Sequence, residues 1–470
     1  MLIAAWLVSL TPLSELVRMA MATAPSIIIG LAVGVVVMIF ARGIEWLYVL
    51  IYIVFLEQIF NIGASFIDET VMVLLTFKIL ILRRSPVKHE TGRYIVAFVL
   101  VSLVSAALNG VPPDVFVAGV RSFIQYIRVF LFIFNSKMTE EDFNRLITTL
   151  IISGLLFSAV GLVNIFTGRV SEEGRSEGVL SNANALAAYL AFILPFLWFN
   201  RIEKGFLPWL KDLKLRWLGL ITFFAFISTG SRAMIIGVGT GLILVTVLKS
   251  GDLKQKLKLA TMIILLSAAG IIITEGRIVE RFSQVASKEY LDPETNVRTY
   301  YSEQGWRIFQ DKPLLGVGPG RYGGSVSTIW DSPVYTEYGI RFPNEWAGVV
   351  QADVFYPHLF AEIGILGTLF FALLIARPVL IWIWRLLMES LHWTPLGASL
   401  TASLVAIIVG STGGSYLELH LTSIFYWTFL ATLILEMTRQ RTAHINANIA
   451  RMTGEHGPAG RAESGKVSIK

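Results

Sequence analysis

The sequence predicts an all-α integral membrane protein, a polytopic bundle of about 12–14 transmembrane helices with one large, partly helical loop on its exterior, periplasmic face. Of its 470 residues, 54% are apolar and only 15% are charged, which argues against a water-soluble globular domain. Several apolar runs approach the roughly 17–25 residues that cross a hydrocarbon core of about 30 Å. The runs lack the period-two alternation of an outer-membrane barrel, so we expect them to span as helices.

The apolar runs define the expected helices. Residues 1–22 form an apolar segment interrupted at Pro12, and no basic residue precedes this run, so a cleaved signal peptide is not expected. The expected spans then follow at Thr23–Phe40, Gly43–Asn61, Phe66–Leu82, Arg93–Leu108, Val115–Phe134, Arg145–Phe166, Asn184–Phe199, Leu215–Ile227, Ala233–Leu248, Leu257–Thr274, Tyr356–Ile375 with a continuation toward Trp384, Leu396–Gly410 and Leu421–Leu435.

The charges in the connecting segments predict the topology. Lys and Arg gather in the loops 200–216 and 249–258, which the positive-inside rule places in the cytoplasm. By alternation, the turn 168–182, the junction 228–232 and the long loop 275–353 lie outside, and in that loop acidic residues outnumber basic ones. The formal net charge of +6 therefore reflects topology and predicts no nucleic-acid partner.

This topology divides the chain into four parts. They are N-terminal transmembrane helices (1–274), a large exterior loop (275–355), C-terminal transmembrane helices (356–436) and a disordered cytoplasmic tail (437–470). A structureless loop of this length is uncommon in a compact protein, so we expect the exterior loop to fold. Within it, Thr299–Phe309 fits an amphipathic helix, and the glycines of Pro313–Gly324 predict a turn that approaches other backbone closely.

Two exterior motifs combine a short turn with an arginine. In R-S-E-G-V-L-S-N-A-N, Arg175 stands beside a helix start that Asn182 or Asn184 can cap, which makes an anion site. In S-T-G-S-R-A, Arg232 lies at the membrane boundary, where an arginine either reaches for lipid headgroups or serves a functional site. Arg121 and Arg128, seven positions apart in one expected span and therefore on one face of its helix, are weaker candidates of the same kind.

The exterior loop and the span after it carry a third and a fourth motif. G-V-G-P-G (316–320) lacks the Lys-Ser/Thr of a phosphate-binding loop and follows no strand, so it predicts a tight turn. In D-V-F-Y-P-H-L-F-A-E-I-G-I-L-G, His358 and Glu362 are one helical turn apart and form either a proton relay or a helix-stabilising pair. A zinc site would need a further ligand, for which only His420 stands at another expected exterior end, and the chain has no cysteine, so neither metal nor cofactor is expected.

In their order along the chain, these four motifs resemble the membrane glycan ligases and polymerases of the O-antigen ligase/polymerase superfamily, from about Arg175 to Ala376. The resemblance implies a GT-C-like bundle in the bacterial cytoplasmic (inner) membrane with its active site on the exterior face. It implies inverting, metal-independent transfer of a glycan from an undecaprenyl diphosphate carrier to a hydroxyl acceptor. Ligases use a lipid A core as acceptor, and polymerases use another lipid-linked repeat.

The resemblance also suggests which residues bind the diphosphate. Arg175 looks like the arginine of the family's R-x-x-G-x-x-x-N-x-N stretch, Arg232 like that of its S-R-x-A junction, and Arg298 like the one that opens the loop helix. We expect these three, with Arg321, to bind the diphosphate, and Arg298 to act in catalysis. Arginine suits this task because it stays charged and can donate two parallel hydrogen bonds to phosphate oxygens.

The general base is where this sequence departs from the family. The family's histidine commonly lies eleven residues before the first glycine of G-x-x-G, and here Asp353 holds that position, whereas His358 lies six residues before Gly364. Imidazole has the more suitable basicity, so His358 is preferred and Asp353 is the second choice.

Two other functions fit the same motifs. One is a transporter or flippase for lipid-linked oligosaccharide that performs no chemistry, and the other is a protein O-oligosaccharyltransferase. A large folded exterior loop is unusual for a carrier, which favours the glycosyltransferase. Ligase and polymerase remain equally compatible with the motifs.

Overall fold

Helices form all the regular structure that is described. In the computed structural model, the described residues are 71–73, 75–76, 79, 90–135, 140–171, 174–180, 182–202, 213–249, 257, 261, 277–284, 287, 291–346, 348–388 and 392–453, and no strand occurs among them. Within this part, four helices are long and apolar enough to cross a membrane, or five if a bent pair counts as one span. The chain is thus an all-α polytopic membrane protein, as predicted.

The described spans coincide with the expected apolar runs. The long helices are α6 (Glu90–Leu108), α9 (Glu140–Phe166), α21 (Phe355–Ile375) and α24 (His420–Thr453), and the shorter apolar ones are α10 (Ala183–Ile202), α12 (Leu213–Ser228), α13 (Arg232–Lys249) and α23 (Pro395–Gly410). The spans expected at Thr23–Phe40, Gly43–Asn61, Phe66–Leu82 and Leu257–Thr274 lie outside the described residues, apart from isolated positions. The total of about 12–14 spans therefore stays a prediction.

One expected span is two helices. The run Val115–Phe134 consists of α7 (Pro113–Ile124) and α8 (Ile127–Asn135), which meet at a bend of 56°. Arg121 and Arg128 accordingly stand on different helices, so the expectation that they share a face of one helix is wrong. The hydropathy of the sequence does not reveal this bend, because the segments on both sides of it are apolar.

The C-terminal segments also differ from expectation. Helix α21 does not continue toward Trp384, because a separate helix, α22 (Arg377–Leu387), begins with proline in its first turn. Helix α24 extends to Thr453, so residues 437–453 of the expected disordered tail are helical. The physical reason is that no glycine or proline interrupts the chain between His420 and Thr453, whereas Gly454 follows directly.

The loop 275–355, called the exterior loop after its predicted side, is folded where it is described, as predicted. Its helices are α15 (Arg277–Gln284), α17 (Val297–Asp311), α18 (Ser325–Ile329), α19 (Pro333–Glu337) and α20 (Pro343–Trp346), and a 3-10 turn, η2 (Gly178–Leu180), precedes α10. Helix α17 covers the predicted run Thr299–Phe309 and begins where the side chain of Asn296 accepts the N–H groups of Arg298 and Thr299. A separate buried cluster that includes Tyr300, Tyr301, Ile308, Tyr322, Val334 and Tyr335 holds the loop together. Packing of aromatic side chains therefore orders the loop in a chain without cysteine.

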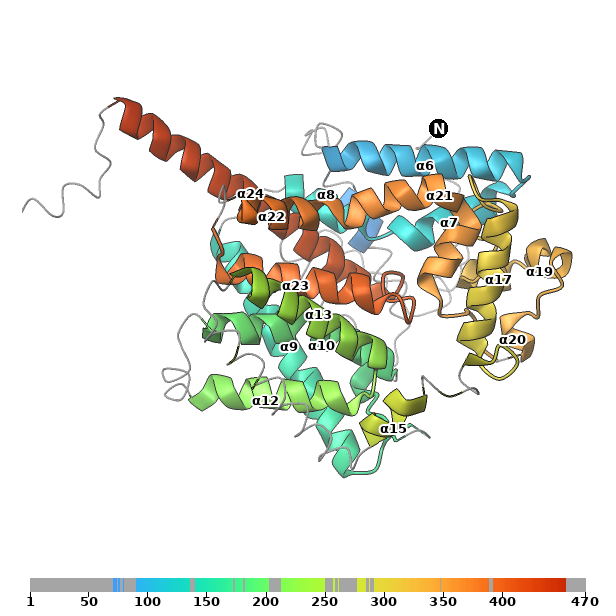
Figure 1. Ribbon diagram of the computed structural model, residues 1–470, viewed down its shortest axis with the longest axis horizontal. Helices are drawn as coiled ribbons and strands as arrows, with labels where there is room; N and C mark the ends of the chain where they lie inside the picture. Colours follow the sequence, from blue (N-terminus) through green and yellow to red (C-terminus); the bar gives the residue numbers. More distant parts are fainter. Residues whose placement is uncertain are drawn as a thin grey trace, which may run out of the picture.

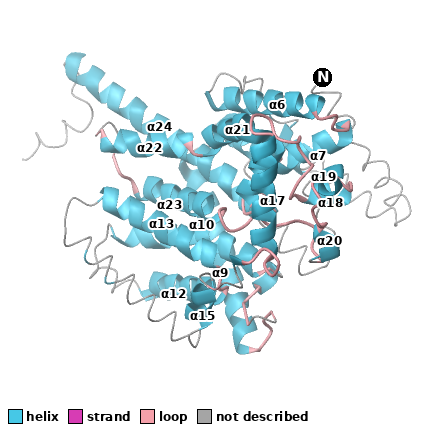
Figure 2. Cartoon of the chain, turned by 45° about the vertical axis from the view of Figure 1, so that its right-hand side comes forward, coloured by secondary structure: helices cyan, strands magenta, loops and turns pink. Residues whose placement is uncertain are grey.

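The helices are arranged so that the two ends of the bundle differ. The long helices run roughly side by side, and α17 lies across one end of them (Figure 1). The junction between α12 and α13 and the turn between α23 and α24 lie at that same end, whereas the C-terminal part of α24 projects from the opposite end. The turned view shows loop segments gathered around α17 (Figure 2). This separation agrees with the predicted topology, in which the exterior loop and the C-terminal segment face opposite sides.

Candidate functional site

Arg175 is fixed at the loop-bearing end of the bundle. Its Nε donates to the carbonyl of Thr229 at 2.7 Å and its Nη2 donates to Oδ1 of Asn184 at 2.6 Å. The neighbouring Asn182 caps α10 by accepting the N–H groups of Asn184 and Ala185 at 2.9 and 3.0 Å. The two asparagines therefore divide the expected roles, since Asn182 caps the helix and Asn184 orients the arginine.

Arg232 begins α13 directly after the junction that Arg175 contacts. Two glycines of α13, Gly237 and Gly241, allow it to approach α23 closely, because a Cβ at either would lie 2.3 Å from a carbonyl oxygen of that helix. Just before Arg232, the hydroxyl of Ser231 lies 2.9 Å from that of Tyr416, on the turn that follows α23. The arginine segment is thus held against this turn, which we define as residues 411–419.

Arg298 and Asp353 meet beside the same turn. The guanidinium of Arg298 is paired with Oδ2 of Asp353, whose Oδ1 accepts the N–H of Ser415 at 2.8 Å. Asp353 has a φ of +54°, in the left-handed region that residues other than glycine seldom adopt. The side chains of Arg298 and Asp353 remain 38% and 31% exposed, so both are open to a ligand.

His358 lies in the interior. Its side chain is 2% exposed, with Nε2 3.2 Å from Oε2 of Glu362 and Nδ1 3.1 Å from Oε1 of Glu418. The loop covers its ring so closely that a Cβ at Gly324 would lie 2.8 Å from it. Both ring nitrogens face carboxylates rather than solvent, and this position does not favour His358 as the base that meets a sugar hydroxyl.

The glycine-rich turn and the start of α21 interlock through their backbones. Gly364 has a φ of +60°, which interrupts α21 and frees helical carbonyls and N–H groups. The turn at 313–320 satisfies them in both directions: Ile365 and Leu366 donate to Pro313 and Leu314, and Val317 and Gly318 donate to Ala361 and Glu362, at 2.8 to 3.3 Å. The third and fourth motifs are therefore two halves of one structure, and the predicted tight turn with close backbone approach is confirmed.

The Glu362 side chain completes this interlock. Its Oε2 accepts the N–H of Gly320 at 2.8 Å and its Oε1 accepts the N–H of Tyr322 at 2.7 Å. Arg321, between these two residues, directs its Nη2 to the carbonyl of Gly110 on the turn between α6 and α7, at 3.1 Å. Arg321 is thus directed to a different neighbourhood from Arg175 and Arg298.

The turn 411–419 is the part of the site that the sequence motifs did not identify. Burial raises the pKa of Tyr416 above its ordinary value, the hydrogen bond with Ser231 lowers it, and the charges of Asp353, Arg298 and Arg175 also act on it. The hydroxyl therefore stays protonated and lies within electrostatic reach of all three charged residues. The signal that the sequence offered was the short segment between the expected spans Leu396–Gly410 and Leu421–Leu435, which carries both Tyr416 and Glu418.

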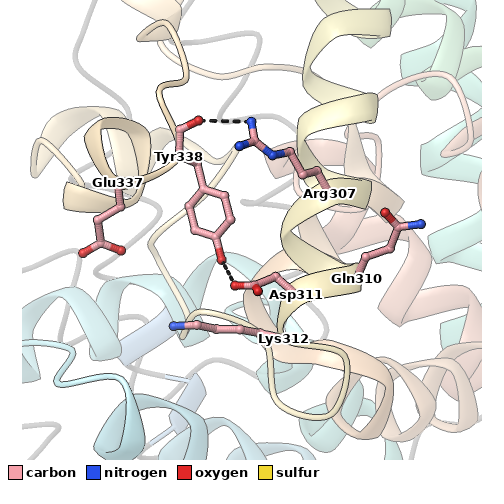
Figure 3. Close-up of a pocket in the computed structure, with 6 residues that line it drawn as sticks. All are labelled: Arg307, Gln310, Asp311, Lys312, Glu337 and Tyr338. Carbon is pink, nitrogen blue, oxygen red and sulfur yellow. Dashed lines mark hydrogen bonds between the residues drawn. The ribbon is translucent and has the colours of Figure 1, made fainter.

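A hollow of about 680 Å³ lies elsewhere on the exterior loop (Figure 3). Its lining residues are Arg307, Gln310, Asp311, Lys312, Glu337 and Tyr338. The Tyr338 hydroxyl donates to Asp311 at 2.5 Å, and Arg307 donates to the Tyr338 carbonyl at 3.2 Å. None of the arginines expected to bind a diphosphate lines it, so it is distinct from the site built around Asp353.

A comparison with known protein families gives a match over the part of the chain that contains most of these residues. Residues 217–372 match the family model described as O-antigen ligase. No curated protein matches the chain. The matched residues contain Arg232, Arg298, Asp353 and His358, whereas Arg175 and the turn 411–419 lie outside them. Over these residues, a third of the chain, the match confirms the resemblance that the motifs carry to the O-antigen ligase/polymerase superfamily, and it suggests a role in surface glycan assembly.

Proposed function

We propose that the protein is a glycosyltransferase of the bacterial inner membrane that transfers a glycan from an undecaprenyl diphosphate carrier to a hydroxyl acceptor at the exterior face. The observation that carries this proposal is the meeting of arginine-bearing segments at one end of the bundle. Arg175 contacts the junction before Arg232, and Tyr416 joins that junction to the turn that also holds Asp353 and its partner Arg298.

The arginines supply what the leaving group requires. Breaking the bond between the anomeric carbon and the phosphate oxygen leaves negative charge on the lipid diphosphate, which needs stabilisation rather than a proton. Guanidinium groups held in a poorly hydrated site stabilise such developing charge strongly. Arg175, Arg232 and Arg298 have this role in the proposal. Arg321 points toward Gly110, so the proposal gives it a contact with the donor outside the group of residues around Asp353.

Asp353 is the base in this proposal. The acceptor oxygen attacks the anomeric carbon as the phosphate oxygen departs, which inverts the configuration, and the hydroxyl proton passes to the carboxylate. Asp353 is partly exposed beside Arg298, whereas His358 is buried between two carboxylates. The pairing with Arg298 orients the carboxylate, and in the proposal the same arginine also stabilises the charge of the diphosphate.

The test is conversion of a lipid diphosphate-linked glycan by the purified full-length protein in vesicles. The proposal predicts a glycosylated acceptor together with released undecaprenyl diphosphate. A lipid A core acceptor tests ligation, a second lipid-linked repeat tests polymerisation, and an acceptor polypeptide tests protein O-glycosylation. Movement of the intact donor across the bilayer with no product in any arm would reject the glycosyltransferase in favour of a flippase.

A further inference from the structure

The turn 411–419 reaches the site at two points, although it lies outside the residues that match the family. The hydroxyl of Tyr416 bonds with that of Ser231, next to Arg232. The N–H of Ser415 donates to Asp353 Oδ1. Arg298 holds the other oxygen of the same carboxylate. The turn therefore stands between the arginine junction and the Asp353 pair, and it contacts both.

A buried ionic cluster anchors this turn to the exterior loop. Glu418 is 7% exposed and faces His358, which in turn faces Glu362, itself 0% exposed. Through its two oxygens, Glu362 binds the N–H groups of Gly320 and Tyr322. The cluster thus connects the α23–α24 turn, the start of α21 and the glycine-rich turn of the loop.

Such a cluster is a costly way to hold two loops together. The free-energy cost of moving charged groups out of water is offset only when each group has a partner. Ionisable residues within membrane proteins usually serve a function. Apolar side chains could join the same loops, but they would not fix the register as the charge pairing of His358 and the two backbone hydrogen bonds of Glu362 do. The arrangement is therefore suited to holding the turn in one position relative to the loop.

We infer that the turn 411–419 is a positioning element of the transfer site, in which Tyr416 fixes the Arg232 segment, Ser415 orients Asp353, and Glu418 anchors the turn through His358. This inference rests on the proposed function. It assigns Tyr416 and Glu418 as positioning residues, since they act through other residues and not on the donor itself. The cluster gives His358 a role as the bridge between two carboxylates.

The experiment compares Tyr416→Phe and Glu418→Gln with two controls in the same helix pair. Tyr426→Phe removes a buried hydroxyl that bonds the carbonyl of Ile375 at 3.0 Å. Glu436→Gln changes a buried carboxylate that accepts from Thr394 at 3.2 Å. Both controls alter the bundle away from the site. The measurements are kcat and KM for the lipid diphosphate donor, with the thermal midpoint of every variant.

The two test variants are expected to lower kcat about tenfold while KM changes less than about twofold, the signature of a lost transition-state arrangement. Both controls keep kcat near that of the wild type. Ser231→Ala combined with Tyr416→Phe is expected to be no worse than Tyr416→Phe alone, because one hydrogen bond is lost in each case. A merely structural role predicts losses that follow the thermal midpoint in all four variants.

Each outcome decides the inference. If the wild type transfers glycan and Tyr416→Phe behaves like Tyr426→Phe, the positioning role is rejected while the proposed function stands. If the wild type transfers nothing to any acceptor, the proposed function is rejected, and this inference with it. Should Glu418→Gln fail to fold, Tyr416→Phe decides alone, since it removes a single oxygen atom.

Discussion

Arg298 and Asp353 form an ion pair although 55 positions separate them in the chain. Arg298 belongs to the first turn of α17 and Asp353 directly precedes the cap of α21, so the pair joins the start of α17 to the start of α21. Both side chains are about one-third exposed, and pairs of this kind contribute only about 0–1 kcal/mol to stability. The pair is therefore better explained by its place in the site than by the stability of the loop.

The first prediction is that Arg298→Ala lowers turnover by about a hundredfold or more while the protein stays folded. Loss of one donor that stabilises developing charge costs roughly 3 kcal/mol in the transition state. Arg298→Lys should restore little of the turnover, because an ammonium group cannot donate the two parallel hydrogen bonds that a planar guanidinium gives to phosphate. Single-turnover rates with a lipid diphosphate donor measure both effects.

Arg341→Ala is the matched control for this prediction. Arg341 also belongs to the exterior loop and pairs with a carboxylate, that of Glu294 at 2.8 Å, but it does not contact Asp353 or the turn 411–419 in any described interaction. We expect this variant to retain most of its activity. Near-normal transfer by folded Arg298→Ala, or equal losses in both variants, would contradict a specific role for Arg298.

The second prediction separates the two candidates for the base. Asp353→Asn keeps the shape of the side chain but removes its ability to accept the acceptor proton, so kcat should fall about a hundredfold or more with little change in the thermal midpoint. A loss below about fivefold would show that positioning and leaving-group stabilisation suffice without this carboxylate. The acceptor concentration must be saturating, so that the rate reports the chemical step.

The third prediction is that His358→Ala chiefly lowers stability. Without the imidazole, Glu362 and Glu418 remain buried, and breaking a buried ionic arrangement costs about 3–5 kcal/mol. We expect a marked fall in the thermal midpoint and in the yield of folded protein. An unchanged midpoint with a loss of kcat larger than that of Asp353→Asn would instead restore His358 as the base.

The sequence predicted what depends on composition and local pattern. Apolar runs located the described spans, and the pattern of Thr299–Phe309 located α17 within two residues at each end. The contacts of the site did not follow from the sequence, because Arg175, Ser231, Asp353 and Tyr416 come together only through helix packing that small residues such as Gly237 and Gly241 permit. The burial of His358 escaped prediction for the same reason, since Glu418 belongs to a distant turn.

The fourth prediction concerns topology. The chain has no cysteine, so single cysteines can be introduced without changing any other residue. Thr336→Cys in the exterior loop should react with a membrane-impermeant maleimide in intact spheroplasts, whereas His444→Cys near the end of α24 should react only after permeabilisation. Both positions are exposed, so reactivity reports sidedness and not burial. The opposite result would reverse the assigned orientation.

The last prediction tests the interlock between the glycine-rich turn and α21. Gly364 and Gly339 share a positive φ, of +60° and +62°, but Gly364 also has a ψ of −167°, in a region that is open essentially to glycine alone. A Cβ at Gly364 would lie 2.4 Å from the backbone of Leu314, whereas one at Gly339 would meet nothing within 4 Å. Gly339→Ala therefore carries only the cost of the left-handed conformation, about 1–2 kcal/mol. Gly364→Ala adds the separation of two backbones that exchange four hydrogen bonds, and we expect a loss of stability of more than about 3 kcal/mol, with loss of transfer activity. Thermal midpoints and transfer rates of the two variants provide the comparison. Equal midpoints would mean that α21 accommodates the extra methyl group and that the interlock does not hold the loop in place.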